Sequence, residues 1–347
     1  MRSIKYLVAG AGGIGGAIAG KLAEAGKEVT LIARGAHLDA IRERGLVLAV
    51  DQCGAAPNHD DKVSGNGVGS REERTVKGLR ACTADEYIAQ IEVNGEAPDV
   101  IFICVKGYSI PGIAPFLSNV AKAAEAAKAA NCPIMIPILN GFCMGEHIRG
   151  FVTGGRIVEG LTFLSSQKDG PGRILMRGEK FRMEFGDSGR CDQPPVTDEE
   201  GETIAEDLRE CGIDAYYTNN ILPESIRKFT FVASAAGAGY YYDALLREFQ
   251  KPGEKRDTLA SISGEIRDLA SAMGVTFDYD LVEKTLEMAD TLSPDSNSSL
   301  QRDMAAGGRN EFDSLIREPV RMGEKYGVDM PVLRKVAESY SGDGLSI

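Results

Sequence analysis

Short apolar runs alternate with helical patterns over the first part of the chain. Residues 6–9 form an apolar run typical of a strand buried on both faces of a parallel sheet, and residues 29–32 form a second one. Between them, apolar side chains at Ile14, Ile18 and Leu22 recur at helical spacing. These three segments predict a β-α-β unit at the start of the chain.

The same pattern divides the rest of the chain into two parts. Further strands are predicted at 100–105, 134–139, 158–164, 181–185 and 213–217, and helices at 224–236, 240–249, 258–273, 280–289, 311–326 and 332–340. Residues 51–78 are rich in Gly, Asn, Asp and Ser, which predicts a long surface loop. We therefore expect an α/β fold: an N-terminal Rossmann-type parallel sheet domain (1–218) that carries the long loop, followed by an all-helical C-terminal domain (219–347).

Composition limits the class of protein. The formal charge of −12 argues against a broad nucleic-acid-binding surface. No apolar run approaches the roughly 18 residues of a membrane span, and the N-terminal segment is a poor signal peptide. The 7 cysteines and 3 histidines are scattered without metal-ligand spacing. We expect a cytoplasmic protein with no metal and neither nucleic acid nor a membrane as partner.

A glycine-rich motif joins the first strand to the first helix. It has the pattern G-x-G-x-x-G, and the predicted cofactor-binding positions in it are Gly10, Gly12, Gly13, Ile14 and Gly15. In this context the glycines form a tight turn, let the backbone approach a pyrophosphate and let the helix pack closely on the strand. The alternative is a tight strand–helix turn with no ligand.

The end of the second strand bears on the choice of cofactor. An acidic residue that binds the ribose of NAD is expected about twenty residues after the motif, but the sequence has Ala33 and then Arg34. A guanidinium is suited to a 2′-phosphate, so the sequence favours NADPH. Otherwise Arg34 is a solvated surface residue.

Three further residues are candidates for substrate chemistry. Lys106 and Asn140 each follow a predicted strand, where the carboxyl ends of parallel strands line a ligand crevice; each is also compatible with an ordinary loop. Lys228 interrupts a largely apolar helix, and burial there would lower the pKa of its ammonium toward neutrality. That position predicts a proton donor for carbonyl reduction, unless the side chain only reaches solvent at the domain edge.

Taken together, these motifs resemble the ketopantoate reductase family (2-dehydropantoate 2-reductases). The matching segments are 10–16, 31–35, 104–106, 137–141, 171–172, 227–228, 298–303 and 308–311. The resemblance implies NADPH-dependent reduction of a 2-oxo acid by hydride transfer, in a protein that forms a homodimer through its helical part. Related 3-hydroxyacid or opine-type dehydrogenases, and a non-catalytic NADP-binding sensor, remain alternatives.

The resemblance also implies roles for single residues. Lys228 would be the general acid, and Glu311 would orient Lys228 or accept a hydrogen bond from a substrate hydroxyl. Ser299 would bind the substrate carboxylate, and Asp303 would hold the local helix arrangement. Lys106 and Asn140 would flank the nicotinamide and the substrate.

Two positions depart from the family pattern. Four and eight residues after Lys228 the family usually carries asparagines, whereas this chain has Val232 and Ala236. Since a site built to bind a hydroxyl loses discrimination without its partner, the exact 2-oxo acid stays open.

Overall fold

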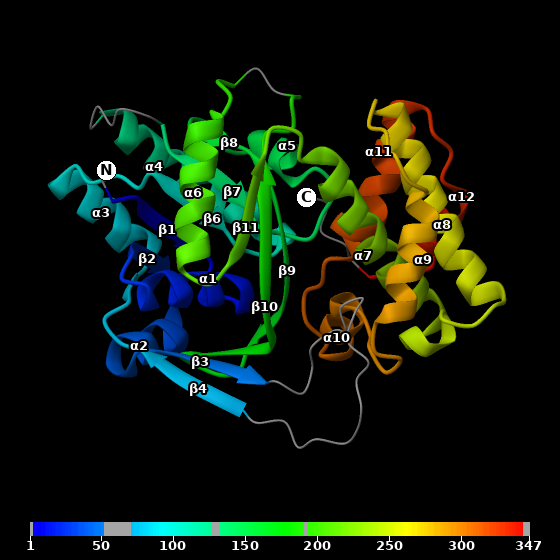
Figure 1. Ribbon diagram of the computed structural model, residues 1–347, viewed down its shortest axis with the longest axis horizontal. Helices are drawn as coiled ribbons and strands as arrows, with labels where there is room; N and C mark the ends of the chain where they lie inside the picture. Colours follow the sequence, from blue (N-terminus) through cyan, green and yellow to red (C-terminus); the bar gives the residue numbers. More distant parts are fainter. Residues whose placement is uncertain (1–2, 52–70, 127–131, 191–192, 343–347) are drawn as a thin grey trace.

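In the computed structural model, the chain is described over residues 3–51, 71–126, 132–190 and 193–342. The strands lie in one part of the molecule and the later helices in another, side by side along the longest axis (Figure 1). The last strand, β11 (Asp214–Thr218), ends shortly before the long helix α7 (Leu222–Tyr242) begins.

A parallel sheet forms the centre of the N-terminal part. Its described strands follow the spatial order β5-β2-β1-β6-β7-β8, and every neighbouring pair is parallel. They are β1 (Lys5–Ala9), β2 (Glu28–Ile32), β5 (Arg80–Cys82), β6 (Val100–Ile103), β7 (Ile134–Pro137) and β8 (Arg156–Ile157). The chain changes its direction across the sheet between β1 and β6, which places a ligand crevice at their carboxyl ends. The predicted Rossmann-type parallel sheet, followed by a helical part, is confirmed.

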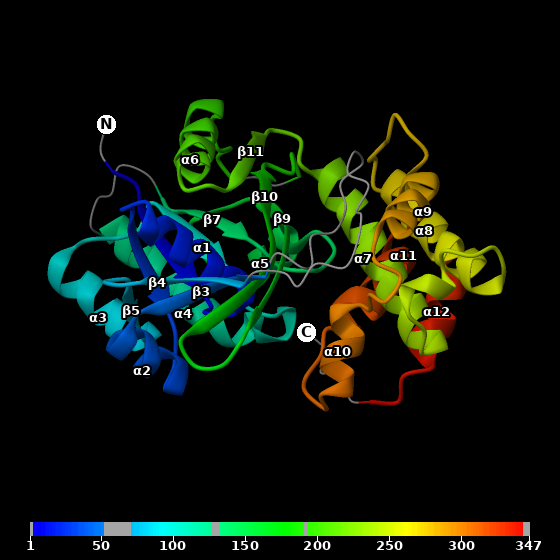
Figure 2. The ribbon, with the colours of Figure 1, turned by 60° about the horizontal axis from the view of Figure 1, so that its bottom comes forward.

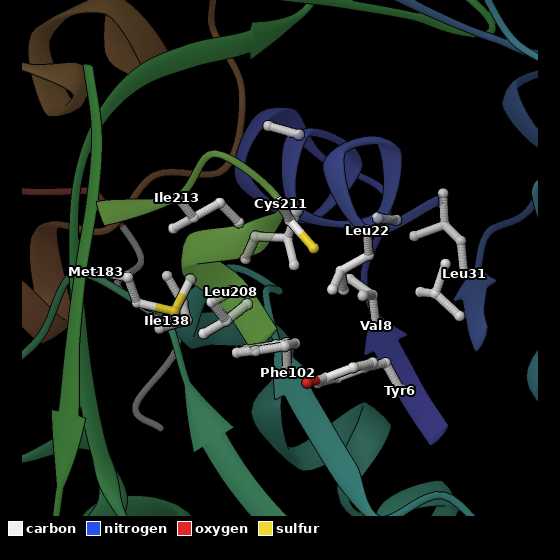
Figure 3. Close-up of a cluster of buried hydrophobic side chains, with 14 of the residues drawn as sticks. Tyr6, Val8, Leu22, Leu31, Phe102, Ile138, Met183, Leu208, Cys211 and Ile213 are labelled. Atoms are coloured by element: carbon white, nitrogen blue, oxygen red, sulfur yellow. The ribbon is translucent and has the colours of Figure 1, made fainter. Parts of the chain in front are cut away.

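Helices cover both faces of this sheet. They are α1 (Gly13–Glu24), α2 (Gly35–Arg44), α3 (Ala84–Asn94), the short 3-10 helix η2 (Gly107–Ser109), α4 (Ile110–Ala126), α5 (Met144–Arg149) and α6 (Asp198–Glu210). Successive side chains of β1 point to opposite faces, so Leu7 packs in one apolar cluster and Val8 in another. Figure 3 shows Tyr6, Val8 and Phe102 gathered with Leu22 of α1 and Leu208 of α6.

A second, mixed sheet packs beside the first. It consists of β3 (Leu46–Asp51), β4 (Arg71–Val76), β9 (Glu159–Lys168), β10 (Arg173–Gly186) and β11, in the order β11-β10-β3-β4 with β9 paired to β10. β10 runs parallel to β3 and β11 but antiparallel to β9. The predicted strands at 158–164, 181–185 and 213–217 therefore exist, but they build this separate sheet.

The prediction of a continuous surface loop at 51–78 is wrong in its later part. Residues 71–76 form strand β4, which pairs antiparallel with β3; residues 52–70 lie outside the described part. Five of the six β4 side chains are exposed and Val76 alone is buried, as expected of an edge strand, so no apolar alternation marks it. Ion pairs of Arg71 with Asp169 and of Arg173 with Glu73 link this edge to the β9–β10 hairpin.

The C-terminal part is built around α7. After it come η3 (Leu246–Glu248), α8 (Glu254–Ala272), α9 (Leu281–Thr291), α10 (Ser299–Ala305), a π-helical turn η4 (Asp313–Arg317), α11 (Glu318–Tyr326) and α12 (Pro331–Glu338). Small residues in α7 allow close packing: a Cβ on Gly237 would lie 3.1 Å from the Ile316 side chain. Figure 2 shows α7 running between the second sheet and these helices.

Two helix predictions in this part need correction. No separate helix spans the predicted range 240–249: its first residues belong to α7, which ends at Tyr242, Asp243 adopts a left-handed conformation with φ of 46°, and only the short 3-10 helix η3 follows. The predicted helix at 311–326 begins instead as the π-helical turn η4. Within the described ranges, no helix is both long and apolar enough to cross a membrane.

Candidate active site

At three glycines of the turn between β1 and α1, an added Cβ would clash with neighbouring backbone atoms. Gly10 has a φ of +117°, and a Cβ there would lie 2.9 Å from the Cys104 carbonyl carbon. A Cβ on Gly15 would overlap the Gly10 carbonyl oxygen, and one on Gly13 would lie 2.6 Å from the Ser166 backbone. β6 and β9 therefore fix the path of this turn, and larger residues are excluded by the protein itself.

Gly12 differs from these glycines because its surroundings are open. A Cβ at Gly12 meets nothing within 4 Å among the described residues. Gly12 is also the N-cap of α1, whose first turn has no acidic side chain and no side-chain cap. The free N–H groups and the helix dipole at this open edge suit the phosphates of a dinucleotide.

Arg34 lies at the carboxyl end of β2, the neighbour of β1, directly after Ala33. It is exposed and is the N-cap of α2. In the described parts of the chain, no hydrogen bond or ion pair engages its guanidinium, which is therefore available to an anion at the end of β2.

Lys106 brings the two parts of the chain together. It follows β6, and its ammonium contacts Asp303 Oδ2 of α10 at 3.0 Å and Glu311 Oε2 at 2.8 Å. Glu311 is 4% exposed and also accepts a hydrogen bond from the Gly107 amide at 3.4 Å. Desolvation lowers the pKa of Lys106, but the two carboxylates outweigh it, so the pKa is raised and the side chain stays charged.

Lys228 faces the carboxyl end of β7 from α7. Its ammonium donates a hydrogen bond to Asn140 Oδ1 at 3.2 Å and lies 6.0 Å from the centre of the Phe163 ring. Part of the side chain is exposed, yet protein surrounds the ammonium closely enough that desolvation lowers its pKa to about 8. The charge of Glu311 acts in the opposite direction, to raise this pKa. A lysine with this pKa can both hold and release a proton near neutral pH.

Both carboxylates of the site contact Lys106. The resemblance implies that Glu311 orients Lys228 or accepts a hydrogen bond from a substrate hydroxyl; in the structure the Glu311 carboxylate is bonded to Lys106 and Gly107, and its charge acts on Lys228. Asp303 was expected to hold its helix, and its side chain also pairs with Lys106. Sequence spacing does not show which of two lysines a distant carboxylate will contact.

Ser299 is the first residue of α10 and is partly exposed. The hydroxyl that caps this helix belongs to its neighbour Ser298, in a capping box with Gln301. Gln301 also donates to the carbonyl oxygens of Gly239 at 3.1 Å and Ala244 at 3.0 Å. These bonds fix α10, and with it Asp303, against the end of α7.

A pocket lies between α7 and the strand ends beside Lys228. Its described lining residues are Leu139, Asn140, Gly141, Met144, Glu159, Gly160, Leu161, Ser225, Lys228, Phe229 and Val232. Val232 therefore shares the pocket with Lys228, whereas Ala236 is buried elsewhere in the helical core.

Two features near this site were not predicted from the sequence. Glu159 is 1% exposed and accepts a hydrogen bond from the Glu146 amide at 3.0 Å; burial raises the pKa of its carboxyl. An acidic residue at the start of an apolar strand was the signal for it. Arg309 stacks over the Tyr108 ring at 4.4 Å and links the two parts of the chain beside Lys106; nothing in the local sequence marks that pair. The described side chains include no group of three or more potential metal ligands.

The fold and the site define a class: a Rossmann sheet with an open glycine turn and Lys106 at its carboxyl end, completed by Lys228, Asp303 and Glu311 from a second, helical part. This is the plan of a two-part, dinucleotide-dependent oxidoreductase.

Comparison with known proteins identifies the family. The family model of ketopantoate reductase PanE/ApbA matches residues 6–190, and the model of its C-terminal part matches residues 220–341. The chain belongs to the ketopantoate reductase family, whose members are oxidoreductases that use pyridine nucleotides and act on small molecules.

Individual relatives are distant but match along the whole chain. An uncharacterized oxidoreductase, YkpB, of Bacillus subtilis is 26% identical over 96% of this chain and 96% of its own. A 2-dehydropantoate 2-reductase of Pyrococcus horikoshii is 25% identical over 98% of this chain and 99% of its own. A D-mandelate dehydrogenase, solved with NADH and anilino(oxo)acetate, has the same fold at 21% identity, with a TM-score of 0.75 over 96% of each chain.

Proposed function

We propose that this protein reduces a 2-oxo acid to the 2-hydroxy acid with NADPH, and that Lys228 donates the proton to the carbonyl oxygen. The observation that carries the proposal is Lys228 itself. It is an ammonium at the carboxyl end of the parallel sheet, hydrogen-bonded to Asn140 and with its pKa lowered to about 8 by desolvation. General acids work best when their pKa is near the working pH.

The residues of the crevice fit the cofactor. Gly12 and the first turn of α1 would hold the diphosphate, with Gly10, Gly13, Ile14 and Gly15 shaping the turn. Arg34 would bind the 2′-phosphate, because it is exposed and no acidic residue stands at the end of β2. Lys106 and Asn140 would lie beside the nicotinamide, which supplies the hydride when bound.

The remaining residues would bind and orient the substrate. Lys106 is placed to share its charge between Asp303, Glu311 and an incoming carboxylate, with Ser299 as a second contact at the start of α10. The carbonyl carbon gains the hydride and the carbonyl oxygen gains the Lys228 proton. Solvent then returns a proton to the Lys228 amine, and the charge of Glu311 favours that protonated form.

Replacement of Lys228 tests this proposal. In the Lys228→Met variant we expect kcat to fall by about 10²–10⁴-fold while NADPH binds as in the wild type. Absorbance of NADPH measures turnover, and quenching or calorimetry measures binding. The Lys335→Met variant, which removes an exposed lysine of α12, is the matched control. A wild-type kcat in Lys228→Met would show that Lys228 is not the proton donor.

Two of the relatives suggest which substrates to test first. One is named for 2-dehydropantoate and one for D-mandelate, and both names describe a 2-oxo acid and 2-hydroxy acid pair. NADPH binding without turnover of any 2-oxo acid or 3-hydroxy acid would instead favour the sensor alternative. The cytoplasmic location and the homodimer stay predictions.

A further inference from the structure

The pocket beside Lys228 has two kinds of wall. Leu139, Met144, Leu161, Phe229 and Val232 contribute apolar side chains to it. Its hydrogen-bonding residues are Asn140, Glu159, Ser225 and Lys228. Asn140 is already bonded to Lys228, and Glu159 accepts a bond from the Glu146 amide, so both already have partners in the protein.

The order of the lining residues along α7 distinguishes a polar end of the pocket from an apolar end. Ser225 lies one helical turn before Lys228, and Val232 lies one turn after it, on the same face. Beyond Val232 this face continues with the buried Ala236. A substrate group that extends past the Lys228 ammonium along α7 therefore lies against Val232, whose side chain neither donates nor accepts a hydrogen bond.

We propose that the 2-oxo acid accepted by this pocket carries an apolar, uncharged side chain, and that Val232 is a specificity-determining residue. The proposal rests on the proposed function, since it takes the carbonyl oxygen to lie at Lys228. The substrate is then a monocarboxylate, and its carbon chain beyond the carbonyl bears neither a hydroxyl nor a second acid group.

Two physical effects exclude the other substrate types. A hydroxyl held against Val232 gives up its bonds to water without replacement, which makes binding less favourable. A second carboxylate in the pocket would lose its water shell close to Glu159, whose own carboxyl is buried at 1% exposure. Burial already raises the pKa of Glu159, as expected where negative charge is poorly solvated.

A matched pair of substrates tests the effect of the hydroxyl alone. Trimethylpyruvate has the carbon skeleton of 2-dehydropantoate, with a hydrogen in place of its hydroxyl. With the full-length protein and saturating NADPH, we expect kcat/KM for trimethylpyruvate to exceed that for 2-dehydropantoate by about tenfold or more. We expect 2-oxoglutarate, which has a second carboxylate, to be poorer than trimethylpyruvate by at least about tenfold.

Two variants of similar size show whether Val232 is responsible. Val232→Asn places an amide where the hydroxyl would lie, and Val232→Leu places a side chain of the same branched shape there without hydrogen-bonding groups. We expect the ratio of the two kcat/KM values to fall by about fivefold or more in Val232→Asn, toward 2-dehydropantoate. The ratio should change less than about twofold in Val232→Leu, and NADPH affinity shows that both variants are folded.

The outcomes separate this inference from the proposed function. Three results would overturn the inference and leave the reductase proposal standing. They are equal kcat/KM values for trimethylpyruvate and 2-dehydropantoate, a higher kcat/KM for 2-dehydropantoate or 2-oxoglutarate, and the same ratio of kcat/KM values in Val232→Asn as in Val232→Leu. If no 2-oxo acid oxidises NADPH, the proposed function is wrong, and the inference falls with it.

Discussion

The glycine turn and the lysine–carboxylate cluster are the two halves of the candidate site, and they are built differently. The turn is one continuous segment, and steric overlap with its own backbone, β6 and β9 restricts Gly10, Gly13 and Gly15. The cluster joins Lys106, at the carboxyl end of the parallel sheet, to Asp303 and Glu311 of the helical part, about two hundred residues away along the chain. The turn therefore depends on local sterics, while the cluster depends on how the two parts dock.

The largest contrast is expected between two glycines of the turn. Gly15→Ala places a Cβ on the Gly10 carbonyl oxygen, and we expect a loss in the free energy of unfolding on the order of 3 kcal/mol. Gly12→Ala meets open space at an ordinary φ of −78°, so the loss should stay below about 1 kcal/mol. Its NADPH affinity should nevertheless fall by about tenfold, because the methyl group occupies the ligand side.

Urea denaturation and NADPH titration of the two variants measure these effects. Equal stabilities would show that the turn is not restricted by the overlap at Gly15. Wild-type NADPH affinity in Gly12→Ala would place the cofactor elsewhere.

Removal of the lysine from the cluster should have the next largest effect. Lys106→Met leaves the buried Glu311 carboxylate with the Gly107 amide as its remaining hydrogen-bond partner in the described structure. We expect the free energy of unfolding to fall by about 2 kcal/mol, below the usual cost of breaking a buried pair because Lys106 is partly exposed.

A double-mutant cycle with Glu311→Gln checks this assignment. The double variant should recover part of the loss, since no unpaired carboxylate remains buried. Strictly additive losses would show that the two side chains are not coupled.

The choice of cofactor gives a smaller effect. Arg34→Ala should weaken NADPH binding by about tenfold and leave NADH binding unchanged, because NADH lacks the 2′-phosphate. Arg42→Ala is the matched control, since Arg42 in the last turn of α2 is already bonded to the Ala81 carbonyl and to Glu86. An equal loss of affinity for both nucleotides in Arg34→Ala would contradict the role of Arg34.

The same contrast explains how much of the molecule could be predicted from the sequence. Local patterns were enough to predict the strand–turn–helix unit, from an apolar run followed by a glycine turn. They also marked Lys106 and Asn140 as candidate site residues, because each follows an apolar run, and Lys228, because it is a charge on an apolar helix. The pairing of Glu311 with Lys106 rather than Lys228 could not be predicted, because both lysines lie near it and the docking of two distant segments decides between them.

The edge strand β4 and the short helix α10 could not be predicted from the apolar pattern, for a different reason. β4 and α10 each bury a single side chain, Val76 and Leu300, so neither shows a period of two or of 3.6 residues. The capping box of Ser298 and Gln301 was a local signal for α10. β4 has no such signal, because its stability comes from pairing with β3 and from charged partners on the hairpin.

The central claim is that Lys228 donates the proton, and the pH dependence of kcat tests it most directly. Because the protonated amine is the active form, kcat should be constant below a pKa of about 8 and fall tenfold per pH unit above it. Glu311→Gln removes a charge that raises this pKa, so the falling limb should move to lower pH. A profile that stays flat from about pH 7 to about pH 10, or a limb that Glu311→Gln moves upward, would contradict the account.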